Sequence, residues 1–282
     1  MSDIVYKKIG FSTPFLTGYK TLRIPIVSAD GVPIWPQLFP LEKIEQMRLT
    51  VGPRHFSAQM MLEFVSPDKA RLDPGGIHFY DSEFDVRTAR IGTHQITGMV
   101  LYWDPSTGRK RRDNSTCVLL YRDDASRNVF VHDILYLSVP DEEEYPLSRQ
   151  CEMVLEFMRN RDIRRISVET NGIGGGLPDI LRNTACRHGQ NIYIQRISNN
   201  KSKSERILNA IEPILSTGRM YAHARIQQTP LLSEMLGFSP LGMTGHDDGI
   251  DALAGAIVQT PSPIRPSGTT TRMFAANTNF KI

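Results

Sequence analysis

Hydrophobic and polar positions divide most of the chain into three consecutive strands followed by alternating helices and strands. Continuous or alternating apolar runs predict strands over residues 97–104, 116–123 and 129–138. The later pattern predicts, in chain order, a helix over 145–160, a strand over 165–169, a helix over 177–188, a strand over 191–196, a helix over 203–216, a short strand near Tyr221 and a helix from about 248. This order predicts an α/β fold in which helices flank a mixed β-sheet.

The two ends of the chain have a different pattern. Prolines interrupt residues 1–95 repeatedly, and the only helix expected there covers 41–49. We therefore predict an irregular adaptor segment over 1–95 and a main domain over 96–260. Residues 261–282 are rich in proline, serine and threonine, which predicts a flexible tail.

Isolated acidic residues stand at the ends of two predicted strands. Asp104 follows the apolar run 99–103, and Glu169 ends a short β-branched strand before a glycine-rich turn. In open α/β sheets, functional sites are built at the carboxyl ends of the strands. The alternative is that both acids are ordinary turn residues, because Asp104 precedes a proline and Glu169 precedes a Thr-Asn-Gly sequence.

A third acidic group opens the last predicted helix. Asp247, Asp248 and Asp251 precede or begin an otherwise apolar stretch, and Asp248 and Asp251 are spaced to lie on one helical face. Such residues can simply cap a helix and complement its dipole. His246, beside them, could orient a water or act as a surface cap.

Carboxylates drawn from two strand ends and one helix start would repel one another unless cations neutralise them. Hard oxygen ligands suit Mg²⁺ or Mn²⁺. Two such ions can activate a water and stabilise the leaving oxygen during attack on a phosphodiester. The combination of the three acidic segments therefore predicts a metal-dependent nuclease.

The sequences YWDPS, VETNGIGGG and HDDGIDALAGAI, which contain these acids, resemble the three acidic motifs of the nuclease domain of tailed-phage terminase large subunits, within the ribonuclease H superfamily. Residues 31–61 and 198–221 are similar to further segments of that family. The resemblance implies a ribonuclease H-like mixed sheet and one or two Mg²⁺ or Mn²⁺ ions. The residues it implies as catalytic metal ligands are Asp104, Glu169, Asp248 and Asp251, with Asp247 as a further ligand.

The same resemblance implies double-stranded DNA as the substrate, cut with little base preference during phage genome packaging. A packaging ATPase, a small terminase subunit and a portal are the candidate partners. The chain contains no GxxxxGK[ST] string, so we expect no ATP hydrolysis by that route. Either it is the nuclease half of a longer protein, or another polypeptide supplies the motor.

Basic residues are concentrated at two places, although the net charge is only +3. The sequence GRKRR at 108–112 reads as a hairpin after Asp104, and a second group opens the helix at 203. Solvated surface positions are the simple explanation, and contacts with DNA phosphates are the functional one. The candidate DNA-binding residues are Arg109, Lys110, Arg111, Arg112, Lys201, Lys203 and Arg206.

The lengths of the apolar runs and the spacing of the cysteines bear on where the protein works and on whether it is cross-linked. No apolar run reaches the length of a membrane span and no leader-like segment opens the chain, so we expect a cytoplasmic protein with no membrane partner, in the host cell if phage-encoded. Cys117, Cys151 and Cys186 show no CxxC pairing and are expected to be buried thiols.

Two alternatives to the nuclease remain: a RuvC-like junction resolvase, whose last acidic motif is similar, and a non-catalytic docking module of a packaging motor.

Overall fold

A computed structural model describes residues 20, 22–28, 30–62, 72–106, 115–199, 202–238 and 246–264. The chain forms two compact units, Met1–Val65 and Ser66–Ile282. We expected the division near residue 95, but the strand at 77–80 already belongs to the main sheet of the second unit. The first unit contains helix α2 (Leu41–His55) and the π-helix η1 (Phe56–Met60), which share a small core around Ile44 and Phe56.

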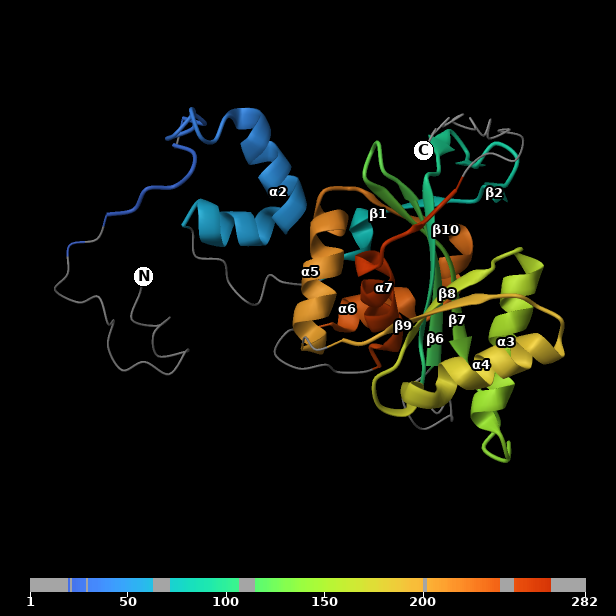
Figure 1. The fold of residues 1–282 in the computed structure, drawn as a ribbon. Helices are drawn as coiled ribbons and strands as arrows, with labels where there is room; N and C mark the ends of the chain where they lie inside the picture. The colour runs from blue at the N-terminus through green and yellow to red at the C-terminus, as the bar shows by residue number, and fades with distance from the viewer. Residues whose placement is uncertain are drawn as a thin grey trace, which may run out of the picture. The chain divides into compact units, whose positions relative to one another are not determined.

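The second unit is built on one mixed β-sheet with the order β1-β10-β7-β6-β5-β8-β9 (Figure 1). Its strands are β1 (Ile77–Tyr80), β5 (Gly98–Asp104), β6 (Ser115–Asp123), β7 (Asn128–Leu137), β8 (Arg165–Glu169), β9 (Tyr193–Ile197) and β10 (Met220–His223). Strand β6 is antiparallel to both β5 and β7, and the other neighbours along this order pair in parallel. The carboxyl ends of β5 and β8 therefore lie at the same edge of the sheet.

This arrangement confirms the predicted mixed β-sheet flanked by helices, with an antiparallel β5–β6–β7 meander beside parallel β8 and β9. Several short elements carried too little periodic pattern to be predicted. They are strands β1, β2 (Phe84–Asp85), β3 (Arg90–Ile91), β4 (His94–Gln95) and β11 (Ser262–Pro263), helix α6 (Leu231–Gly237), and 3-10 turns η3 (Pro74–Gly76), η4 (Gly172–Gly176) and η5 (Ala224–Gln228). Strands β2, β3 and β4 form a separate small sheet, and β11 pairs with β5.

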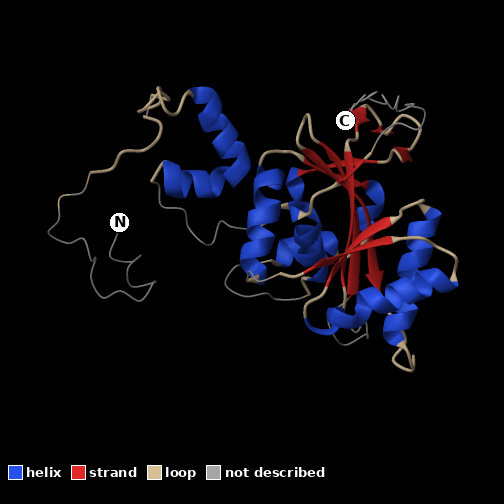
Figure 2. Cartoon of the chain, in the orientation of Figure 1, coloured by secondary structure: helices blue, strands red, loops and turns tan. Residues whose placement is uncertain are grey.

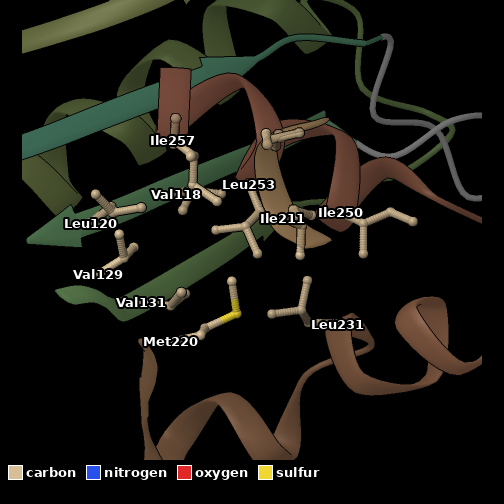
Figure 3. Packing of buried hydrophobic residues seen from close by; sticks show 14 of the residues in the cluster. Val118, Leu120, Val129, Val131, Ile211, Met220, Leu231, Ile250, Leu253 and Ile257 are labelled. Atoms are coloured by element: carbon tan, nitrogen blue, oxygen red, sulfur yellow. The ribbon is translucent and has the colours of Figure 1, made fainter. Parts of the chain in front are cut away.

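Helices cover both faces of the main sheet (Figures 1 and 2). Helices α3 (Pro146–Asn160) and α4 (Leu177–Arg187) pack on one face through a core that includes Trp103 and Val168. Helices α5 (Lys203–Ser216), α6 and α7 (Asp248–Val258) pack on the other. In this second core, shown in Figure 3, Leu253 and Ile257 of α7 lie among strand residues such as Val118.

Cys117 and Cys151 are buried free thiols as expected, but Cys186 is exposed, because it lies on the outer side of α4. Among the described helices, none has both the length and the apolar character needed to cross a membrane.

Helix α7 is the most deeply enclosed helix of the second unit. Ten of its 11 residues are buried, and it packs against β5 and β6 on one side and α5 on the other. Gly255 makes the close contact with β5 possible, because a Cβ atom there would lie 2.4 Å from the Tyr102 ring. The start of α7, where the acids lie, is thus held at a set distance from the sheet.

Replacing Gly255 with alanine should lower the free energy of unfolding by about 1–3 kcal/mol, because the added methyl group overpacks the contact with Tyr102. Alanine is the better helix former by about 1 kcal/mol, so a loss would show that packing outweighs propensity. Urea denaturation measures the difference. The matched control is Gly176→Ala, where an added Cβ meets no atom within 4 Å. Equal stability of the two variants would contradict this account of the α7 contact.

Candidate active site

The acids predicted from the sequence come from three elements that meet at one edge of the sheet. Asp104 is the last residue of β5 and Glu169 the last residue of β8, and these strands pair in parallel through Tyr102–Ser167 and Trp103–Val168. Asp248 begins α7, which packs over β5. Glu169, Asp248 and Asp251 are all buried, with 6%, 7% and 5% of their surface exposed.

Two cations from the start of α5 link the acids. The Nε atom of Arg206 donates to Asp251 Oδ1 at 2.9 Å, and its Nη1 atom lies 3.6 Å from Glu169 Oε1. The Nζ atom of Lys203 lies 2.5 Å from Asp247 Oδ1 and 3.5 Å from Asp251 Oδ2. Glu169, Asp247 and Asp251 therefore belong to one ion-pair cluster.

Asp104 joins this cluster electrostatically. Burial, reinforced by the negative charges of Glu169 and Asp251, raises the pKa of Asp104 to about 8, although the positive charges of Arg206 and Lys203 act in the opposite direction. Burial also raises the pKa of Asp251 above its ordinary value. Lys203 and Arg206 thus offset only part of the repulsion among the acids.

Asp248, the first residue of α7, has His246 and Glu234 as further neighbours. Its Oδ2 atom is 3.8 Å from Nδ1 of His246. Glu234 of α6 is its acidic neighbour, and burial, with a smaller contribution from Asp248, raises the pKa of Glu234. Glu234 accepts hydrogen bonds from the Ile250 amide at 3.0 Å and the Tyr136 hydroxyl at 3.1 Å. It caps the first turn of α7 from a neighbouring helix, a role that was the alternative considered for the aspartates.

Glu169 has two neutral hydrogen-bond donors that sequence reasoning did not select. The Tyr102 hydroxyl donates to Glu169 Oε2 at 2.5 Å, and Asn199 Nδ2 donates to the same oxygen at 2.9 Å. Strand alternation could have identified Tyr102, since it lies two residues before Asp104 on the same face of β5. Nothing local marks Asn199 or Glu234, because their roles depend on partners distant in the sequence.

The predicted DNA-binding residues divide into two groups. Lys203 and Arg206 lie at the site, where both are paired with acids. Arg109, Lys110, Arg111, Arg112 and Lys201 fall outside the described residues.

The side chains suit a divalent cation by chemical type, because carboxylate oxygens are the ligands that Mg²⁺ and Mn²⁺ prefer. Within the described part of the chain, however, no three His, Cys, Asp or Glu side chains already surround one point as metal ligands. The ammonium group of Lys203 and the guanidinium group of Arg206 lie among the acids instead. A bound cation would take over charge neutralisation that these groups now provide.

Neither a protein-family model nor a curated protein matches the chain. Among solved structures, the P22 large terminase nuclease domain is similar at 12% identity and a TM-score of 0.45, over 67% of this chain and 91% of that one. The human cytomegalovirus terminase nuclease domain is similar at 15% identity and a TM-score of 0.43, over 62% and 90%. The HK97 bacteriophage large terminase is similar at 12% identity and a TM-score of 0.44, over 77% and 49%. The structures found thus include the family that the acidic motifs resemble.

The ion pairs at Arg206 yield a stability prediction. Replacing Arg206, whose side chain is 10% exposed, with methionine should lower the free energy of unfolding in metal-free buffer by about 3 kcal/mol, because buried acids lose their main counter-charge. Chemical denaturation in the presence of EDTA measures this loss. Arg149→Met is the control, since it breaks an exposed ion pair with Glu152 and should cost under about 1 kcal/mol. Similar losses of unfolding free energy in both variants would contradict the view that Arg206 is the main counter-charge of the buried acids.

Proposed function

We propose that this protein is a metal-dependent endonuclease that hydrolyses phosphodiester bonds of double-stranded DNA with little sequence preference. The observation that carries the proposal is the meeting of Asp104, Glu169 and Asp251 at one sheet edge, with the pKa of Asp104 raised to about 8 by burial and by its acidic neighbours. A site that concentrates this much negative charge favours the binding of a divalent cation.

Asp104, Glu169, Asp248 and Asp251 are the proposed ligands of one or two Mg²⁺ or Mn²⁺ ions, with Asp247 as a further ligand. When bound, such ions would activate a water and stabilise the leaving oxygen. The protein side chains bind and orient these ions, and the raised pKa of Asp104 means that cation binding must compete with a proton at this carboxylate.

The two cations of the cluster have different proposed roles. The Lys203 side chain is 41% exposed, so it can turn from Asp247 toward a DNA phosphate. The Arg206 side chain is only 10% exposed and is held by Asp251, so it is better placed to balance the charge of the acids. We keep Arg109, Lys110, Arg111, Arg112 and Lys201 as proposed phosphate contacts on the basis of the sequence alone.

The motif resemblance supports a role in cutting concatemeric phage DNA during genome packaging, in the cytoplasm of the host cell. A packaging ATPase, a small terminase subunit and a portal are the proposed partners. The absence of a GxxxxGK[ST] string fits a chain that supplies the cutting step and leaves ATP hydrolysis to another part or polypeptide.

Purified protein should nick or linearise supercoiled plasmid when Mn²⁺ or Mg²⁺ is added, and EDTA should stop the reaction. Asp104→Asn and Glu169→Gln should each lower the cleavage rate at least about 100-fold, because losing a ligand should cost no less than losing an outer-shell partner. Glu152→Gln, which removes an exposed acid on α3 away from the site, should cleave like the wild type. Gel electrophoresis of time courses measures all of these rates.

The same assay separates the alternatives. A docking module would leave plasmid uncut with either metal. A junction resolvase would cut a four-way junction well before a linear duplex of the same sequence. Full activity in Asp104→Asn or Glu169→Gln would refute the assigned site.

A further inference from the structure

We infer that Tyr102, Asn199 and Asn171 are positioning residues that hold one oxygen of Glu169 and leave its other oxygen for the cation. This inference rests on the proposed function and extends it to three neutral residues, of which Tyr102 and Asn171 lie within the acidic motifs and Asn199 outside them. Such positioning would let the Glu169 carboxylate keep one orientation although the neighbouring acids repel it.

The two oxygens of Glu169 have different environments. Oε2 receives the Tyr102 hydroxyl at 2.5 Å and Asn199 Nδ2 at 2.9 Å. Asn199 Nδ2 also lies 3.1 Å from the Tyr102 hydroxyl oxygen, so the three groups form a closed triangle. Oε1 faces Arg206, whose guanidinium also binds Asp251. The neutral donors therefore occupy one oxygen, and the other faces the charged cluster.

Tyr102 is well suited to fix this geometry, because its ring is packed inside the core. The residue is fully buried on β5, and its ring lies against Gly255 of α7. Its hydroxyl therefore donates to Glu169 Oε2 from a position set by the packing of the ring.

Asn171 holds Asn199 in place through its side-chain amide. Its Nδ2 atom donates to the Asn199 carbonyl at 2.6 Å, and its Oδ1 atom accepts from the Asn199 amide at 3.2 Å. This pair of bonds imitates one rung of a β-ladder between the segments that follow β8 and β9. Because Asn171 lies two residues after Glu169, the segment that carries the acid also anchors the donor that orients it.

Hydrogen-bond partners such as Tyr102 and Asn199 are expected to raise the affinity of Glu169 for a cation. A carboxylate with two donors on one oxygen has few orientations left, so less freedom is lost when the other oxygen binds an ion. Losing an outer-shell partner of a metal ligand typically costs about 10–100-fold in metal affinity or activity. The effect should therefore be visible in cation binding itself, without DNA.

The test uses Tyr102→Phe, which removes the hydroxyl and keeps the ring that packs on Gly255. Calorimetric titration with Mn²⁺ alone should show an affinity about tenfold weaker than that of the wild type. In plasmid cleavage, the Mn²⁺ concentration for half-maximal rate should rise by a similar factor, while the rate at saturating Mn²⁺ falls much less. Tyr80→Phe is the matched control, since it removes a hydroxyl hydrogen-bonded to His132 instead, and should bind Mn²⁺ normally.

A second pair of variants covers the case in which Tyr102→Phe fails to fold. Asn199→Ala should weaken Mn²⁺ binding in the same way, and Asn171→Ala should do so to a smaller extent because it acts through Asn199.

Normal Mn²⁺ affinity in folded Tyr102→Phe and Asn199→Ala, together with lost binding in Glu169→Gln, would overturn this inference and leave the proposed function standing. Absence of both Mn²⁺ binding and cleavage in the wild type would overturn the proposed function, and the inference with it.

Discussion

The repulsion among buried carboxylates is the constraint on which the rest of the site depends. Glu169 and Asp251 are almost fully enclosed, and Asp104 is held close enough to both for their charges to raise its pKa. Charges in such a place are costly unless opposite charges accompany them. Arg206 and Lys203, at the start of α5, supply part of that compensation.

Helix α7 packs into the core and also carries two of these acids to the sheet edge. Its apolar side lies among β-sheet residues such as Val118, while its first turn carries Asp248 and Asp251 to the sheet edge. Glu234 accepts the Ile250 amide of that turn, while Asp251 pairs with Arg206 of α5.

Tyr102 joins packing and chemistry in a single side chain. Its ring rests against Gly255 in the core, and its hydroxyl reaches Glu169 at the edge of the sheet. Rigid placement of outer partners is how a protein orients the groups that hold a metal ion. The contact between Tyr102 and Gly255 that packs α7 onto the sheet therefore also places the hydroxyl that binds Glu169.

Sequence alone was enough to predict the strands β5 to β9, the helices α3, α4, α5 and α7, and the acids at their ends, because long apolar runs and helical periodicity are local signals. It also predicted that Asp104 and Glu169 would meet, since sites form where strands of an α/β sheet end. Only the tertiary structure showed that Arg206 pairs with Asp251, that Glu234 caps α7 and that Tyr102 and Asn199 hold Glu169. These contacts join residues between 16 and 67 positions apart in the chain, so no local pattern records them and folding alone brings the partners together.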